Sequence, residues 1–199
     1  LFRSNQLYSY IGETDTKLPN ALAQYFYVDK ATYPNGFNLT DLRFQGQNGQ
    51  NPVIEIYDGS RTISTASLIQ KVNYDFWAYN YPITLKEQIH FAPGSSFWVV
   101  AKFPAGAKNP LGTGKTTRTD VAQYSFYSSD NGTTWTQLSE VLKGTSFEAV
   151  ASQLTWAVQA ISKNPDWSEV LNPEPISGEV RPGESQTVTM RNDGQKLVN

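Results

Sequence analysis

The sequence YSFYSSDNGTTWTQL, residues 124–138, consists of two short alternating runs on either side of a turn-forming loop. Alternation with a period of two predicts strands, and two strands separated by Asp, Asn and Gly predict a hairpin. Gly132 can adopt the positive φ that a tight turn requires. The Asp130 carboxylate can accept hydrogen bonds from the backbone N–H groups that follow it. Trp135 is large enough to cover the underside of the turn, so we expect a well-defined hairpin here.

The strongest strand signal in the rest of the chain is SFWVVAKF, residues 96–103, which is apolar on both faces and predicts a central strand covered on both sides. Residues 21–28, 37–44, 53–57 and 154–161 predict further strands, with a bulge near Thr40 and Asp41 where the apolar phase slips. Residues 62–72 are compatible with a strand or a short helix, and residues 104–119 predict a long loop. Many short strands, frequent turn signals and no long amphipathic helix predict an all-β antiparallel sandwich of jelly-roll type.

The C-terminal part of the chain differs from the sandwich. Residues 1–163 form the predicted sandwich domain, and residues 164–175, with three prolines, are typical of a linker. Residues 176–199 predict one hairpin, which would be barely stable alone. We therefore expect this segment either to dock on the sandwich or to begin a following domain.

Composition excludes several classes of function. The 199 residues include no cysteine, which excludes disulfides, thiolate zinc sites and cysteine nucleophiles. The formal net charge is −2 with no basic run, which argues against a nucleic-acid partner. No apolar run approaches the ~18 residues of a membrane span. A surface rich in hydroxyls and amides favours an extracellular β protein, and a chain starting at Leu1 without a signal peptide predicts a segment of a longer, exported protein.

The loop of the predicted hairpin resembles the Asp-box, the Ser-x-Asp-x-Gly-x-Thr-Trp hairpin of sialidases and other extracellular β proteins. The residues that match its fixed positions are Ser128, Asp130, Gly132, Thr134 and Trp135. In families that carry the box it shapes a turn and usually lies away from the chemistry. The resemblance therefore implies a structural turn and indicates fold more than function.

Longer stretches resemble a β-sandwich module found downstream of subtilisin-like serine proteases secreted by Bacteroidetes. They are FAPGSSFWVVAKFPAGAKNPLGTG (residues 91–114), the hairpin above and LTWAVQAIS (residues 154–162). The tail, residues 177–199, resembles the opening strands of the Ig-like repeat that follows such modules. The resemblance implies a non-catalytic accessory module at the outer cell surface or in the medium, with neighbouring domains and a protein or glycan ligand as partners.

The sequence contains few of the residue arrangements on which enzymes depend. His90 is the only histidine, and the alternation of its strand points it to solvent, so neither a serine-protease triad nor a histidine metal cluster is expected. LGTGKTT, residues 111–117, has Asn109 where a phosphate-binding loop needs glycine. We predict no catalytic residue, no cofactor and no metal, with Asp58 and Asp130 as weak calcium candidates whose simpler role is to cap their own turns.

Two other functions stay open at this stage. Glu55 with Asp58, or Asp166 with Glu169, could form the carboxylate pair of a glycoside hydrolase, although chance alone supplies such pairs. A hydrolase fragment is further disfavoured because only one Asp-box is present. A carbohydrate-binding module is the stronger alternative, because exposed aromatic rings stack on sugars; its candidate platform is Trp77, Tyr79 and Tyr81. A core strand is the simpler account of the same aromatics, because both faces of the run are apolar.

Overall fold

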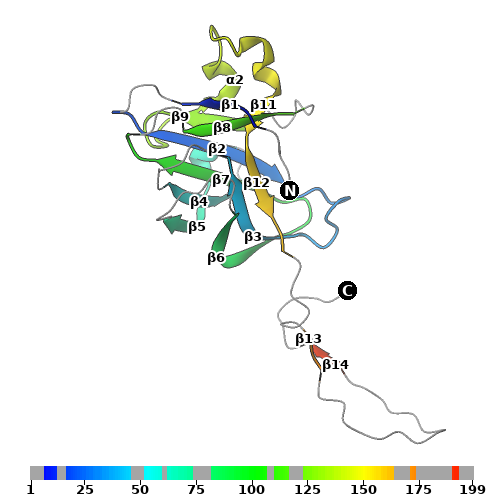
Figure 1. Cartoon of the computed structure of the whole chain (residues 1–199). Coiled ribbons are helices and arrows are strands. Elements are labelled where there is room, and N and C mark those ends of the chain that lie inside the picture. The colour runs from blue at the N-terminus through cyan, green and yellow to red at the C-terminus, as the bar shows by residue number, and fades with distance from the viewer. Residues whose placement is uncertain are drawn as a thin grey trace, which may run out of the picture. The chain divides into compact units, whose positions relative to one another are not determined.

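The computed structural model describes residues 7–12, 17–45, 52–59, 62–73, 82–106, 110–116, 123–163, 171–173 and 190–192. The chain divides into two compact units, residues 1–162 and residues 163–199. The first unit contains three antiparallel sheets that pack on one another (Figure 1). The fold class is thus an all-β sandwich, as the alternating patterns predict, whereas the jelly-roll type stays a prediction.

The largest sheet has six strands, and SFWVVAKF lies inside it. The strand order is β10 (Thr136–Gln137), β9 (Ser125–Ser128), β2 (Asn20–Tyr27), β7 (Ser96–Phe103), β4 (Val53–Asp58) and β5 (Leu68–Asn73). β7 pairs with β2 on one side and β4 on the other, and Phe97 and Trp98, which point to opposite faces, are both fully buried. This confirms the predicted central strand. The ambiguous segment, residues 62–72, contains both a 3-10 turn, η1 (Ile63–Thr65), and β5.

Two three-stranded sheets complete the first unit. One has the order β12 (Val158–Ile161), β3 (Phe37–Phe44) and β6 (Pro82–Phe91), and the other β1 (Leu7–Ile11), β8 (Leu111–Lys115) and β11 (Leu154–Trp156). The pairing of β3 with β6 shifts register between Leu39 and Asp41. The predicted bulge is therefore present, and it explains why the apolar phase of β3 changes at Thr40.

Two strand predictions need correction. Residues 154–161 are not one strand, because β11 and β12 belong to different sheets on either side of Ala157. Backbone hydrogen bonds from Ala157 N to Gly112 O (2.9 Å), from Gly112 N to Gln45 O (3.0 Å) and from Gln45 N to Ala157 O (2.9 Å) hold this crossing point. Residues 104–119 are not a continuous loop, because β8 lies within them as the middle strand of its sheet.

Apolar side chains from all three sheets form the main core between the layers. Its largest fully buried members are Trp156, Phe97 and Phe103. The Trp156 indole Nε1 donates to Phe126 O at 2.8 Å, which ties β11 to β9. The short helix α2 (Leu138–Val141) contributes the fully buried Leu138, and the 3-10 turn η2 (Glu148–Gln153) follows it.

A buried polar group also joins two of the sheets. The Gln24 Oε1 atom on β2 accepts hydrogen bonds from Ser125 Oγ on β9 and Thr155 Oγ1 on β11, both at 2.7 Å. All three side chains are fully buried, so their hydrogen bonds must be made inside the protein. This network fixes the six-stranded sheet against β11.

The six-stranded sheet has a second apolar cluster on its opposite surface, which we call the outer face. Trp98, Val100, Ala23 and Ile63 form this cluster, and Trp135 packs against it. Because the side chains of a strand alternate, β7 supplies Phe97, Val99 and Phe103 to the core and Trp98, Val100 and Lys102 to the outer face. The candidate site lies on this outer face.

In the second unit, β13 (Leu171–Pro173) and β14 (Met190–Asn192) pair antiparallel. β13 falls within residues 164–175, which the sequence predicts as a linker, so three residues of that segment are extended and paired. The remaining residues of the predicted linker and of the predicted Ig-like segment lie outside the described residues, apart from β14. Their assignment stays a prediction.

Candidate functional site

The loop between β9 and β10, residues 128–135, is held by the side chains that match the Asp-box, and we call it the Asp-box loop. The Ser128 Oγ atom donates to Asp130 Oδ1 (2.7 Å) and accepts from the N–H groups of Asp130 (3.2 Å) and Gly132 (2.8 Å). The Asp130 carboxylate accepts from Thr133 N (3.0 Å), Thr134 N (2.9 Å) and Thr134 Oγ1 (2.7 Å). The loop is thus a self-contained hydrogen-bonded turn, as its sequence predicts.

These contacts keep the Asp130 carboxylate ionised. The hydroxyl of Thr134, then its backbone N–H, then the hydroxyl of Ser128 lower the pKa of Asp130 from 3.8 to about 2. Hydrogen bonds to the charged form favour that form. At neutral pH Asp130 is therefore a fixed acceptor for its own turn, which is the simpler of the two roles that the sequence left open for it.

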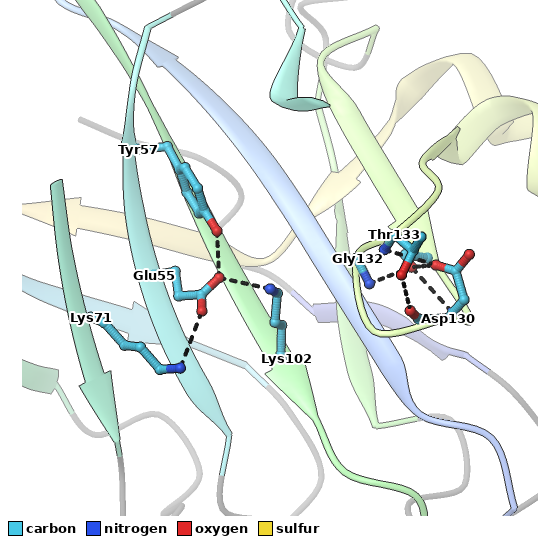
Figure 2. Close-up of polar contacts among 8 residues, drawn as sticks. Glu55, Tyr57, Lys71, Lys102, Asp130, Gly132 and Thr133 are labelled. Carbon is cyan, nitrogen blue, oxygen red and sulfur yellow. Dashed lines mark hydrogen bonds and ion pairs between the residues drawn. The ribbon is translucent and has the colours of Figure 1, made fainter. Parts of the chain in front are cut away.

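The tip of the loop has the backbone conformation that Asn and Gly tolerate best. Asn131 has φ +60° and Gly132 has φ +87°. A Cβ atom on Gly132 would lie 3.0 Å from both Lys102 Cε and Trp135 Cζ2. Gly132 therefore lets the loop pack closely on Lys102 of β7, and this contact connects the Asp-box loop with the charged residues of the outer face (Figure 2).

Those charged residues form what we call the Glu55 cluster: Glu55, Tyr57, Lys71 and Lys102. Glu55 on β4 lies directly opposite Lys71 on β5, and Lys102 on β7 is its diagonal neighbour. Glu55 Oε2 accepts from Tyr57 Oη at 2.6 Å and lies 2.8 Å from Lys102 Nζ, while Glu55 Oε1 lies 3.6 Å from Lys71 Nζ. Figure 2 shows the tyrosine and the two ammonium groups converging on this one carboxylate.

The cluster fixes the protonation states of its members. Burial raises the pKa of Glu55, but the hydrogen bonds from Lys102 and Tyr57 and the charges of both lysines outweigh it, so the pKa is lowered. Burial, followed by the hydrogen bond to and the charge of Glu55, raises the pKa of Tyr57. Near neutral pH Glu55 is thus an anion with lowered basicity and Tyr57 a neutral hydrogen-bond donor with lowered acidity, so both are less suited to proton transfer than free side chains.

A pocket of about 440 Å³ opens beside the cluster. Its polar lining is Glu55, Lys71, Lys102 and, from the Asp-box loop, Asn131. Its apolar lining is Pro19, Val53, Phe103, Pro104 and Ala105. A concave site of this size with a few convergent polar groups and a largely apolar wall is typical of small-ligand sites. We call it the Glu55 pocket.

A second hollow, of about 620 Å³, is more open to solvent. Its lining includes Asp58, His90, Ile69 and Phe91. His90 is exposed, as its strand position predicts, and its Nδ1 atom lies 2.7 Å from Asn38 Oδ1. No charged cluster comparable to that of Glu55 lies among the described residues of this hollow, so it is the weaker candidate.

The structure does not bring the acidic candidates of the sequence together where it describes them. The calcium candidates Asp58 and Asp130 lie on different elements, and Asp58 Oδ1 accepts from Ser67 N at 3.1 Å. Glu55 and Asp58 are three positions apart on β4 and so point to opposite faces. Within the described residues, no group of three or more His, Cys, Asp or Glu side chains could hold a metal ion. The aromatic platform Trp77, Tyr79 and Tyr81, and the pair Asp166 and Glu169, lie outside the described residues.

Sequence reasoning missed the two lysines of the site. Lys102 is the only charged residue in SFWVVAKF, a strand with two apolar faces, and a lysine in such a strand needs a carboxylate partner. That signal could have been noticed. The identity of the partner could not have been predicted, because Glu55 and Lys71 are distant in sequence and meet Lys102 only through the order and register of β5, β4 and β7.

Comparison with known proteins gives no relative for this chain: no family model, curated protein or solved structure matches it. In the part of the chain that the structure describes, no helix has the length and apolar character needed to cross a membrane. Function must therefore be argued from the site itself.

Proposed function

We propose that this chain is a non-catalytic, ligand-binding β-sandwich module of a secreted or cell-surface multidomain protein. The observation that carries the proposal is the Glu55 cluster. Its carboxylate is held as an anion by two ammonium groups and a tyrosine at the edge of a pocket. Such a site can recognise charge and shape, and the lowered pKa of Glu55 and the raised pKa of Tyr57 make both groups poor partners for proton transfer near neutral pH.

The parent protein we propose is a subtilisin-like serine protease of the kind whose accessory modules this sequence resembles. The resemblance rests on residues 91–114, on the Asp-box hairpin and on residues 154–162. The gene on either side of this segment tests this part of the proposal. A protease domain encoded upstream is the expected finding, and a reading frame without one would refute the assignment.

Catalysis by the module itself is tested on the purified chain. Casein, a peptide library and a panel of glycosides should remain intact, since the lowered pKa of Glu55 weakens it as a base and the raised pKa of Tyr57 weakens it as an acid. Glu55→Gln serves as the matched variant. Turnover by the unmodified chain that disappears in this variant would show an enzyme and refute the proposal.

A carbohydrate-binding module is the second candidate, and exposed tyrosines on and next to the six-stranded sheet favour it. Tyr27 at the end of β2 is 51% exposed, and Tyr124 is 37% exposed with its ring 4.8 Å from that of Tyr25. Aromatic rings at a surface can stack on sugars. A glycan array probed with the chain and with Tyr27→Ala tests this candidate, which requires hits that the variant loses.

A further inference from the structure

The Glu55 pocket carries the opposite charge from the chain as a whole. Lys71 and Lys102 contribute two positive charges and Glu55 one negative charge, so the pocket lining has a net charge of +1, against −2 for the whole sequence. The polar groups therefore favour a ligand with one negative charge. Such a ligand would be attracted to this part of the surface more than to the rest of it.

The two lysines have hydrogen-bonding capacity left for such a ligand. An ammonium group has three donors. Lys102 Nζ uses one of them on Glu55 Oε2 at 2.8 Å. Lys71 Nζ lies 3.6 Å from Glu55 Oε1, beyond a good hydrogen bond, and its side chain is half exposed. Both lysines line the pocket, so both have donors available for one carboxylate group of a ligand there.

Acceptors lie beside these donors. Glu55 Oε1, whose lysine partner is distant, and the Asn131 side-chain oxygen can each accept a hydrogen bond from a ligand N–H. A ligand that matches both the lysine donors and these acceptors has a carboxylate with an N–H group next to it. The C-terminal residue of a peptide has this arrangement.

The apolar wall selects the side chain of that residue. Pro19, Val53, Pro104 and Ala105 present small aliphatic groups, and Phe103, the aromatic residue of the described lining, is only 1% exposed. A ring platform for stacking on a sugar is therefore lacking in the described lining. A short aliphatic side chain fits the wall better.

From these features we propose that the Glu55 pocket binds the free C-terminus of a peptide that ends in a small aliphatic residue. The terminal carboxylate contacts Lys71 and Lys102, the last N–H faces Glu55, and the side chain contacts Val53 and Pro104. The Asp-box loop contributes Asn131 and thus forms one wall of a binding site in addition to closing its hairpin. This inference rests on the proposed binding function and specifies its ligand.

The proposal is tested by titrating the ¹⁵N-labelled whole chain with N-acetyl-Ala-Ala-Val as the free acid and as the C-terminal amide. The free acid should shift the backbone N–H signals of β4, β5, β7 and the Asp-box loop. The C-terminal amide of the peptide should bind about tenfold more weakly, because one charge-assisted contact is lost. Equal affinity for acid and amide, or no saturable binding of the acid, would refute the assignment.

Three lysine variants assign the binding to this pocket. Lys71→Gln should weaken binding of the acid about tenfold, and Lys71→Arg should restore most of it, because the charge returns. Lys86→Gln, at an exposed position of β6 in another sheet, should leave the affinity unchanged. Equal losses in Lys71→Gln and Lys86→Gln would show attraction to net charge alone and would refute a specific pocket.

Two further outcomes separate this inference from the function on which it rests. Glucuronate saturating the same signals while the peptide acid fails would refute the peptide ligand but keep the binding module. Cleavage of the peptide during the titration, seen as new product signals, would refute the non-catalytic function even if the acid binds.

Discussion

The two faces of the six-stranded sheet are made by the same strands but are stabilised in different ways. The inner face is apolar along β7, where Phe97, Val99 and Phe103 pack into the main core. The outer face begins in the same manner at Trp98 and Val100 but ends in the charged Glu55 cluster. Apolar burial explains most of the inner face, and the buried polar side chains Gln24, Ser125 and Thr155 there are neutral and hydrogen-bonded to one another.

The difference shows where the protein departs from the simplest sandwich. A carboxylate is buried at high cost unless it is paired, and Glu55, which is 5% exposed, is paired three times. An apolar residue at this position would give a sandwich without that cost. Departures of this kind concentrate at functional sites, which is why the outer face is the better place to look for a ligand.

The largest effect should follow from emptying the inner core. Trp156→Ala removes a fully buried ring and leaves Phe126 O without its indole donor, so we expect a loss of about 3–5 kcal/mol in the free energy of unfolding. Urea denaturation measures this change in the free energy of unfolding. Trp156→Phe keeps most of the volume and should cost clearly less; equal losses would show that the hydrogen bond, and not packing, dominates here.

A smaller effect should follow from breaking the ion pair on the outer face. Lys102→Met leaves Glu55 buried without its nearest ammonium, and we expect a loss of about 1–3 kcal/mol, moderated by the remaining contact with solvent. The double variant Glu55→Leu with Lys102→Met should regain much of that stability, because no unpaired charge remains. Urea unfolding of the unmodified chain, Lys102→Met, Glu55→Leu and the double variant completes the cycle.

The double variant is the sharpest test of the contrast between the faces. If it stays as unstable as Lys102→Met, then the Glu55 cluster is a structural requirement of the sandwich, and the outer face differs from the inner one less than we infer.

The contact between the Asp-box loop and β7 predicts a further effect on stability. Gly132→Ala adds a methyl group at positive φ and 3.0 Å from Lys102 and Trp135, and we expect it to cost about 1–2 kcal/mol. Gly144→Ala is the matched control, since Gly144 also has positive φ (+73°) but has nothing within 4 Å of its Cβ position. Thermal unfolding should show the larger loss for Gly132→Ala; equal losses would mean that the loop does not pack tightly on β7.

The smallest effect concerns the pH dependence of the Asp-box loop. The pKa of Asp130 is lowered from 3.8 to about 2 in the folded chain, so its contribution to stability is complete above about pH 4 and is lost as the pH falls towards 2. Asp130→Asn should make the unfolding temperature depend less on pH in this window, and unchanged dependence would contradict the shift. Glu55, whose pKa is also lowered, should account for part of the pH dependence that remains in Asp130→Asn.

The sequence predicted the parts of the fold that depend on local pattern. Two apolar faces identified β7 as a central strand, the phase slip located the bulge at Thr40, and the Asp-box motif predicted its own turn. It failed at residues 111–115, where glycines and a lysine suggested a loop although β8 lies in the middle of a sheet. Small residues carry little strand signal, and their place in β8 is decided by neighbours on both sides.

By itself, the sequence determined which residues are buried in alternation and how the hairpin loop closes, because both depend on neighbours a few positions away. Only the tertiary structure decided that the chain changes sheets at Ala157 and that Glu55, Lys71 and Lys102 meet beside Asn131. The physical reason is that strand order and register join residues from four separate segments, and a pattern read along one strand carries no information about which strand pairs with it.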